Sequence, residues 1–419
     1  MADLVLPASL LDTDLYKITM QQAVLQHFPA VQGTYRFTHR SKDVYFTREC
    51  YLRFKRSVSA FDRLALSSSE RAWLEKACPY FKPTYLDYLE AYRFKPEQLS
   101  ISFEPGRDAD RGHIHIDVSG PWEETILWEV PLMACLSEIY FTTVDTDWDY
   151  EGQEDAAYKK AETMLQAGCV ISEFGTRRRR SFHTQDIVVK SLIRAAKDNA
   201  GKGAVNGTSN MHLAMKYEVA PIGTIAHEWF MGIGALKGYE HVNAMALTTW
   251  QETYADALQI ALTDTFSTEV FFKDFAANPH LARQWSGLRQ DSGDPFIFAP
   301  RAKGVYEQLG IDFRQKTIIF SDALDVEKVL RLQRQCDELG MRCGFGIGTS
   351  LTNDFKTKSS GYTEKSRALN MVIKLSSVAG TPTVKISDEI TKNTGDLAIV
   401  QQVKELFGIP IKEIDRRVG

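Results

Sequence analysis

The sequence lacks the features that would place it in a membrane, in an oxidising compartment or on a nucleic acid. No segment approaches the ~18 uninterrupted apolar residues of a membrane helix, and the first residues, MADLVLPASLLDTD, have no basic start typical of a signal peptide. The net charge is only −4, from 50 basic and 54 acidic residues, which argues against a general polyanion-binding surface. None of the six cysteines forms a CxxC pair, and scattered thiols are typical of a reducing cytosol. We therefore expect a cytoplasmic protein with no membrane and no nucleic-acid partner.

The rest of the composition is ordinary for a globular protein of 419 residues, with 44% hydrophobic and 25% charged residues. This length predicts two or three domains, or one large barrel with a smaller domain. Residues 1–150 mix helical and strand patterns. A helix is expected after Asp12-Thr13-Asp14, helices between residues 62 and 94, and strands at 34–39, 101–103 and 113–118. We predict an N-terminal α+β domain over residues 1–150.

A different pattern begins near residue 155. Short apolar runs recur, each followed by a polar cluster and a helix-like stretch, which is typical of parallel βαβ units. About eight such units predict a (β/α)-barrel over residues 151–375, with its active site at the carboxyl ends of the strands. We expect residues 376–419 to pack back on the N-terminal domain. The runs end near Ile171, Ala204, Ile225, Leu262, Leu288, Phe320, Phe345 and Leu375.

Two of the polar clusters suggest phosphate chemistry. Gly344-Phe-Gly-Ile-Gly-Thr-Ser350 follows the seventh run, where barrels often bind phosphate, although a plain glycine turn is the alternative. It lacks the Gly-Lys-Ser/Thr of a Walker loop. The run Arg177–Arg180 is either a solvated face or a nuclear address, or it supplies Arg177 as a bidentate phosphate clamp.

Three further positions are candidates for catalysis. His227 lies at a strand-to-helix turn, where an imidazole serves as acid, base or phosphoryl acceptor, unless it is simply structural. Asp294 is explained as the N-cap of a helix that begins at Pro295. That leaves Arg289 and Asp291 to face a ligand. Together these residues predict a barrel enzyme that acts on a phosphorylated small molecule.

The same residues lie in six motifs that resemble those of nicotinate phosphoribosyltransferases. The motifs occur in the family's order from about residue 10 to about residue 350, so the resemblance covers most of the chain. They are Leu11–Lys17, Ser172–Arg179, Asn206–Asn210, Gly223–Trp229, Arg289–Asp294 and Gly346–Ser350.

The resemblance implies a fold and a reaction. The fold is an irregular (β/α) barrel of the type II phosphoribosyltransferase kind with an N-terminal α/β domain. The reaction is nicotinate plus 5-phosphoribosyl 1-pyrophosphate to nicotinate mononucleotide and pyrophosphate, which leads salvaged nicotinate into NAD synthesis. It implies Mg²⁺, coupling to ATP hydrolysis through a phosphohistidine at His227, and a homodimer whose active sites are shared across the interface.

The resemblance also assigns roles to residues. Phe174 and Tyr16 are expected to sandwich the pyridine ring, with the tyrosine supplied by the neighbouring subunit; by periodicity alone, Tyr16 is only a core-edge tyrosine. Arg289 and Thr224 match nicotinate contacts. Arg177 is expected near the ring and the phosphates, and Asp291 near ribose hydroxyls or a hydrated Mg²⁺. Gly348 and Thr349 match the phosphate-binding turn.

Ser209 bears on whether the substrate is nicotinate or nicotinamide. Relatives that use nicotinamide carry an aspartate at this position, where it accepts a hydrogen bond from the amide but would repel a carboxylate. Serine therefore favours nicotinate. A nicotinamide- or quinolinate-using enzyme, and a regulatory nucleotide binder without turnover, are the alternatives. The nuclear reading of the arginine run leaves a second location open beside the cytoplasm.

Overall fold

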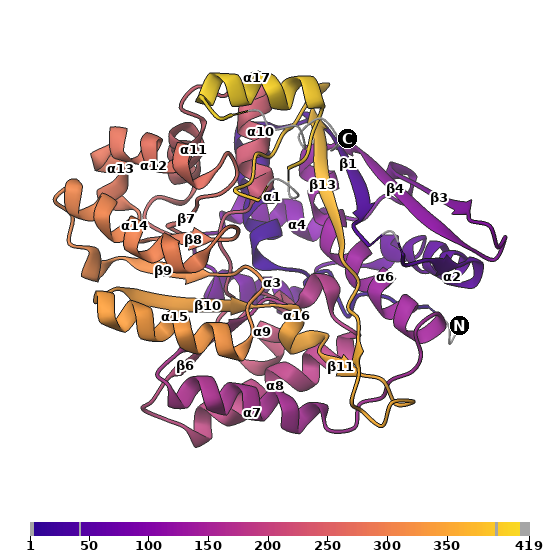
Figure 1. Ribbon diagram of the computed structural model, residues 1–419. Helices are drawn as coiled ribbons and strands as arrows, with labels where there is room; N and C mark the ends of the chain where they lie inside the picture. The colour runs from indigo at the N-terminus through magenta and orange to yellow at the C-terminus, as the bar shows by residue number, and fades with distance from the viewer. Residues whose placement is uncertain (1–3, 42, 390–392, 411–419) are drawn as a thin grey trace.

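Two six-stranded sheets organise the protein (Figure 1). The computed structural model describes residues 4–41, 43–389 and 393–410. The first sheet is antiparallel in its pairings, has the order β14-β13-β1-β4-β2 and carries β3 beside β4. Its strands are β1 (Gln32–His39), β2 (Phe46–Thr47), β3 (Leu99–Pro105), β4 (Arg111–Pro121), β13 (Met371–Val378) and β14 (Thr381–Pro382).

The second sheet is parallel and has the order β6-β5-β10-β9-β8-β7. This arrangement makes the fold α/β, as predicted. The described pairings leave β6 and β7 at the two ends of the order, and closure into a barrel stays a prediction. The strands are β5 (Val170–Glu173), β6 (Ala204–Thr208), β7 (Ile260–Leu262), β8 (Gly287–Gln290), β9 (Thr317–Phe320) and β10 (Arg342–Ile347).

Helices surround both sheets. Those of the N-terminal part are α1 (Leu15–His27), α2 (Arg48–Val58), α3 (Ser68–Ala77), α4 (Pro83–Ala91), α5 (Trp122–Thr125) and α6 (Glu129–Thr143). Those that follow are α7 (Gln153–Gln166), α8 (Phe182–Asp198), α9 (Met211–Tyr217), α10 (His227–Lys237), α11 (Val242–Tyr254), α12 (Thr268–Ala277), α13 (Pro279–Gln284), α14 (Pro295–Gln308), α15 (Val326–Leu339), α16 (Thr349–Thr352) and α17 (Leu397–Phe407). Of the helices in the described part of the chain, none is both long and apolar enough to cross a bilayer.

Six of the eight predicted strand positions are strands of the parallel sheet, and two are not. Around Ile225 the chain forms no strand; just before it, Pro221 makes a single bridge to Thr208. Leu375 lies in β13, which pairs antiparallel with β1 and therefore belongs to the first sheet. The apolar residues at alternate positions of β13, Met371, Ile373 and Leu375, are buried, a pattern typical of a strand with only one covered face.

β13 lies beside β1 in the first sheet and packs against α10, the helix that begins at His227 (Figure 1). β14 continues from it by pairing with β13, so this part of the C-terminal segment lies on the first sheet. Residues 390–392 and 411–419 of that segment lie outside the described residues, and the domain limits at 150 and 375 stay predictions. The predicted cap is confirmed: the Asp294 carboxylate accepts from the backbone N–H of Phe296, with Pro295 at the first helical position.

Candidate active site

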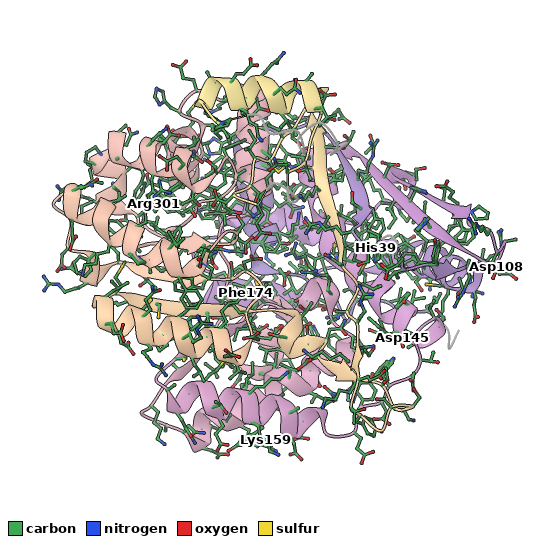
Figure 2. All side chains as sticks on the ribbon, viewed as in Figure 1. His39, Asp108, Asp145, Lys159, Phe174 and Arg301 are labelled. Carbon is green, nitrogen blue, oxygen red and sulfur yellow. The ribbon has the colours of Figure 1, made fainter. Side chains whose placement is uncertain are left out.

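A cavity of about 580 Å³ lies at the carboxyl ends of the parallel strands. We call it the main cavity. Phe174, just after β5, lies near the centre of the molecule (Figure 2). Nine of the ten predicted site residues line this cavity: Tyr16, Phe174, Arg177, Ser209, Thr224, Arg289, Asp291, Gly348 and Thr349. The tenth, His227, lines a smaller neighbouring cavity of about 100 Å³, the inner cavity, which shares Tyr16, Arg177, Arg289 and Asp291 with the main one.

The two aromatic residues predicted to hold a planar ring come from one chain. Tyr16, in the first turn of α1, and Phe174 line the same main cavity. The chain's own Tyr16 therefore lines the cavity, and a tyrosine supplied by a neighbouring subunit stays a prediction. The hydroxyl of Tyr16 is buried and has no hydrogen-bond partner among the described residues, which leaves it available to a ligand.

Gly346 in β10 and Gly348 just after it leave room for Phe174. A Cβ atom on Gly346 would lie only 2.3 Å from Cε2 of Phe174, and one on Gly348 would lie 3.3 Å from the Phe174 carbonyl oxygen. The backbone N–H of Phe174 also donates to the carbonyl of Ile347 at 2.8 Å. The glycine-rich segment therefore serves the ring contact as well as the predicted phosphate turn at Thr349, where the short helix α16 begins.

The Arg289 side chain is fixed by three hydrogen bonds. It donates to the Thr224 hydroxyl at 2.8 Å, to the Ser321 hydroxyl at 2.8 Å and to the Asp291 carboxylate at 3.0 Å. Ser321 also donates to Asp291 at 2.6 Å. Although burial opposes ionisation, Arg289 and His227 hold the pKa of Asp291 well below its usual range. Arg289 and Asp291 thus form a rigid charged pair at the end of β8.

His227 has a distinct partner on each ring nitrogen. Nδ1 lies 3.1 Å from the Thr265 hydroxyl, whereas Nε2 lies 3.0 Å from both the Asp291 carboxylate and the Lys385 ammonium. Burial lowers the pKa of His227 and Lys385 lowers it further, while Asp264 and Asp291 act in the opposite direction. A largely neutral imidazole carries one N–H. When Nδ1 donates to Thr265, the lone pair of Nε2 accepts from Lys385; when Nε2 carries the proton instead, it donates to Asp291.

Three basic side chains that the sequence reading missed line the two cavities. Lys374 lines the inner cavity together with Lys385, and Arg40 lines the main cavity. Burial lowers the pKa of Lys374 well below its usual range, and the charges of Lys385 and Arg40 add to this effect. Like charges in such proximity repel each other and favour an anionic ligand. No local pattern could have revealed them, because Arg40 follows β1 and both lysines come from residues after the parallel sheet.

The four consecutive arginines are not a solvated face. Arg179 makes two hydrogen bonds to the Asp12 carboxylate, at 2.7 and 2.8 Å, and its side chain is 4% exposed. Arg180 is fully buried, with its guanidinium 3.7 Å from the ring centroid of Phe141. Arg177, whose side chain is 38% exposed, pairs with Glu129 at 3.1 Å and lines both cavities. Arg179 and Arg180 therefore stabilise the fold, whereas Arg177 and Arg178 line the main cavity.

Ser209 has a charged neighbour that the sequence reading did not anticipate. Its hydroxyl donates to the Asp14 carboxylate at 2.7 Å, and Asp14 is buried and lines the main cavity. Burial raises the pKa of Asp14, against the hydrogen bonds from Thr176 and Ser209. The N-cap pattern before α1 gave Asp14 a structural role only, because the contact joins residues 195 positions apart in the chain.

His227, Asp264 and Asp291 bring possible metal-ligand atoms within 4.8 Å of one another. The Lys385 ammonium lies 3.1 Å from Asp264 and 3.0 Å from His227, so a cationic group already occupies this position. The set does not fit a resident metal ion held by all three residues. Asp291, with its side chain 21% exposed toward the cavity, fits a hydrated Mg²⁺ whose other ligands are substrate oxygens.

The chain was compared with known families, curated proteins and solved structures. The model of the nicotinate phosphoribosyltransferase family matches residues 169–411, and the model of that family's N-terminal domain matches residues 11–137. A probable nicotinate phosphoribosyltransferase of Schizosaccharomyces pombe is 44% identical over 96% of this chain and 98% of its own. A nicotinate phosphoribosyltransferase of Methanosarcina mazei is 43% identical, again over 96% and 98% of the two chains.

Solved structures agree with this result. A crystal structure of a putative nicotinate phosphoribosyltransferase from Saccharomyces cerevisiae, 42% identical, superposes with a TM-score of 0.92 and covers 96% of this chain and 98% of its own. That of a nicotinate phosphoribosyltransferase from Porphyromonas gingivalis, 36% identical, gives a TM-score of 0.87 and covers 96% and 99%. Both family models, the curated relatives and the solved structures agree, and the chain belongs to the nicotinate phosphoribosyltransferase family.

Proposed function

We propose that the protein transfers a phosphoribosyl group from 5-phosphoribosyl 1-pyrophosphate to nicotinate, with coupling to ATP hydrolysis through His227, in the salvage of nicotinate for NAD synthesis. The main support is one arrangement. Aromatic Tyr16 and Phe174, the fixed cation Arg289 and the turn at Thr349 line a single cavity that adjoins His227. These groups suit a planar ring, its carboxylate and a phosphate, in that order.

The chemical step is a displacement at ribose C1. The pyridine nitrogen donates its lone pair to C1, the bond from C1 to the pyrophosphate oxygen breaks, and its electron pair leaves on pyrophosphate. The chain contributes by positioning: Arg289 holds the carboxylate, while Tyr16 and Phe174 keep the ring in line. Negative charge that develops on the leaving group is stabilised by the fixed cations around the cavity, such as Arg40 and Arg178.

The second half of the proposal gives His227 a covalent role. Neutral Nε2 attacks the terminal phosphorus of ATP, ADP leaves, and water later hydrolyses the phosphoramidate bond. The lowered pKa of His227 supports this role because an imidazolium has no lone pair on either nitrogen. Thr265 would hold the proton on Nδ1. Lys374 and Lys385 would neutralise the phosphoryl group.

Mg²⁺ would be held by Asp291 together with substrate phosphate oxygens, and it would neutralise phosphate charge while bound. We also keep as proposals the closure of the parallel sheet into an irregular barrel and the assembly of the chain into homodimers. In that dimer a tyrosine from the neighbouring subunit would join the chain's own Tyr16, which lines the cavity of its own chain.

The deciding experiment measures pyridine mononucleotide formation from 5-phosphoribosyl 1-pyrophosphate and Mg²⁺. Nicotinate, nicotinamide and quinolinate are offered separately, with and without ATP. We expect product from nicotinate, a higher yield with ATP, and loss of the ATP effect in His227→Ala. Product from nicotinamide would overturn the substrate assignment. An ATP effect that survives in His227→Ala would overturn the phosphohistidine, and no product from any base would favour a regulatory binder.

A further inference from the structure

A row of alternating charges runs beneath the inner cavity. The Lys17 ammonium, fully buried in α1, contacts the Glu129 carboxylate at 2.6 Å and the Glu228 carboxylate at 2.5 Å. Glu129, at the start of α6, also accepts from Arg177 at 3.1 Å. Glu228 is the residue directly after His227, in the first turn of α10. The Lys17 ammonium therefore links Glu129, which binds Arg177, to Glu228, which lies in the same helical turn as His227.

Each carboxylate has at least two partners. Besides Lys17, Glu228 accepts from the Tyr35 hydroxyl of β1 at 2.5 Å and from the Trp122 indole N–H of α5 at 2.9 Å. The side chains of Glu129 and Glu228 are only 9% and 8% exposed. Although burial opposes ionisation, Lys17 and Arg177 lower the pKa of Glu129, and the two carboxylates raise the pKa of Lys17. Lys17 and Glu129 therefore stay charged at neutral pH.

Stability alone does not account for this arrangement. A buried ion pair is often no more stabilising than apolar residues of the same volume, because desolvation offsets the attraction. What the row does provide is geometry, since its side-chain contacts join α1, β1, α5, α6 and α10. Glu129 and Glu228 also line the inner cavity together with His227 and Arg177, so the row borders both reactive ends of the site.

We infer that Lys17, Glu129 and Glu228 are positioning residues that tie the placement of Arg177 at the ring-binding end to the placement of His227 at the phosphoryl end. The inference rests on the roles proposed above for Arg177 and His227. Neither carboxylate touches substrate in this assignment. Each acts through its neighbour: Glu129 orients the Arg177 guanidinium, and Glu228 holds the backbone turn from which the imidazole projects.

The test asks whether a change at one end alters the chemistry at the other. Glu129→Gln keeps the side-chain shape but removes the charge. We expect it to slow phosphorylation of His227 by ATP about fivefold in the absence of nicotinate, through a loss of about 1 kcal/mol. Glu228→Gln should raise the KM for nicotinate by a similar factor when ATP is saturating. A purely structural role would lower Tm and leave both parameters of the folded enzyme unchanged.

Lys17→Met supplies the double-mutant cycle. Once the shared ammonium is gone, adding Glu129→Gln should slow His227 phosphorylation no further. Lys216→Met, which breaks an exposed ion pair with Asp186, is the matched control and should alter neither parameter. If Lys17→Met does not fold, the two glutamine variants still decide the matter.

The outcomes separate the two proposals. If wild-type protein forms mononucleotide and phosphohistidine, but each glutamine variant changes only the parameter of the end that it contacts, this inference is wrong and the proposed function stands. Full additivity in the Lys17→Met background also overturns it. If wild-type protein takes up no phosphate on His227, the proposed function fails first.

Discussion

At the residue scale, the reactivity of His227 depends on groups of opposite charge around one ring nitrogen. Lys385 and Asp291 both lie 3.0 Å from Nε2, and Asp264 lies 3.7 Å from it. The lysine favours the neutral ring, whereas the carboxylates favour the imidazolium. Because only the neutral ring attacks phosphorus, this balance sets the lowest pH at which ATP can be used.

The first prediction concerns that pH limit. Phosphorylation of His227 should be constant above its pKa and fall as the pH drops through it, with the midpoint below 6.5 because burial lowers the pKa. Lys385→Met should move the midpoint to higher pH, and Asp264→Asn should move it to lower pH. The measurement is the initial rate of label incorporation from γ-labelled ATP between about pH 5 and pH 8.5. The plateau rates are expected to fall in both variants, so the midpoint is the readout. Equal midpoints in all three proteins would contradict this account.

The second prediction concerns Ser209. Aspartate here would stand within hydrogen-bond reach of Asp14, to whose carboxylate the serine hydroxyl now donates. Two buried carboxylates share a proton at low pH and repel a carboxylate ligand once both ionise. Ser209→Asp should therefore raise the KM for nicotinate at least about tenfold, and more at pH 8.5 than at pH 6.5. Ser209→Asn, of the same shape and no charge, is the control. A KM in Ser209→Asp that matches the control would refute the repulsion.

Single residues also show how far sequence reasoning reached. The motif positions brought nine residues into one cavity, because most of them lie at or shortly after the carboxyl end of a parallel strand. Sequence reasoning did not identify Asp14 and Lys385 as site residues, because their partners, Ser209 and His227, are remote in the chain. The cluster Thr263-Asp264-Thr265-Phe266 did carry a signal, a polar turn after an apolar run, but its contact with His227 required the fold.

At the scale of elements, the turn after β10 and the aromatic residue after β5 depend on each other. β5 and β10 are neighbours in register, with Gly346 opposite Ser172 and Ile347 opposite Glu173. This pairing carries Phe174 across the strand, directly over the α-carbon of Gly346. A glycine that looks like part of a phosphate loop is therefore required for ring packing.

The third prediction follows from that contact. In Gly346→Ala the new methyl group would lie 2.3 Å from the Phe174 ring, so the ring must move. We expect the KM for nicotinate to rise about tenfold or more, because the displaced ring loses stacking worth about 1–3 kcal/mol. The KM for 5-phosphoribosyl 1-pyrophosphate should change less. Gly304→Ala, in α14 with open space around the added methyl group, is the control. Equal KM values for nicotinate in the two variants would exclude this role for Gly346.

Two strand predictions failed for a reason that belongs to this scale. An apolar run marks burial, but it does not say which sheet buries it. The run at Ile225 is buried in an irregular segment before α10. The run at Leu375 belongs to β13, whose partner β1 lies more than 300 residues earlier in the chain. Only the tertiary fold decides such a pairing, whereas consecutive βαβ units follow from local order.

At the scale of the whole molecule, segments before and after the parallel sheet complete the site that its strands build. α1 brings Tyr16 and Asp14, β13 brings Lys374, and the stretch after β14 brings Lys385 to a cavity built on the parallel strands. The family resemblance implies a tyrosine from a neighbouring subunit, and the chain's own Tyr16 also lines the cavity. Within one chain, Tyr16, Phe174 and Arg289 line the main cavity, and His227 lines the adjoining inner cavity.

This completeness gives the fourth prediction, which is tested by mixing two defective variants. Tyr16→Ala loses ring stacking and Arg289→Ala loses the fixed cation, so each should lower turnover at limiting nicotinate by roughly tenfold or more. If sites were shared across a dimer, co-refolded mixtures would contain one intact site in each mixed dimer and recover about a quarter of wild-type turnover. Because both residues line one cavity of one chain, every chain in the mixture stays defective. The mixture should be no more active than the mean of its two components.

A mixture of wild-type protein and Arg289→Ala, refolded in the same way, controls for losses during refolding and should retain about half of the wild-type turnover. Recovery toward a quarter in the test mixture would show that Tyr16 serves a partner's cavity, and would restore the shared site that the resemblance implied.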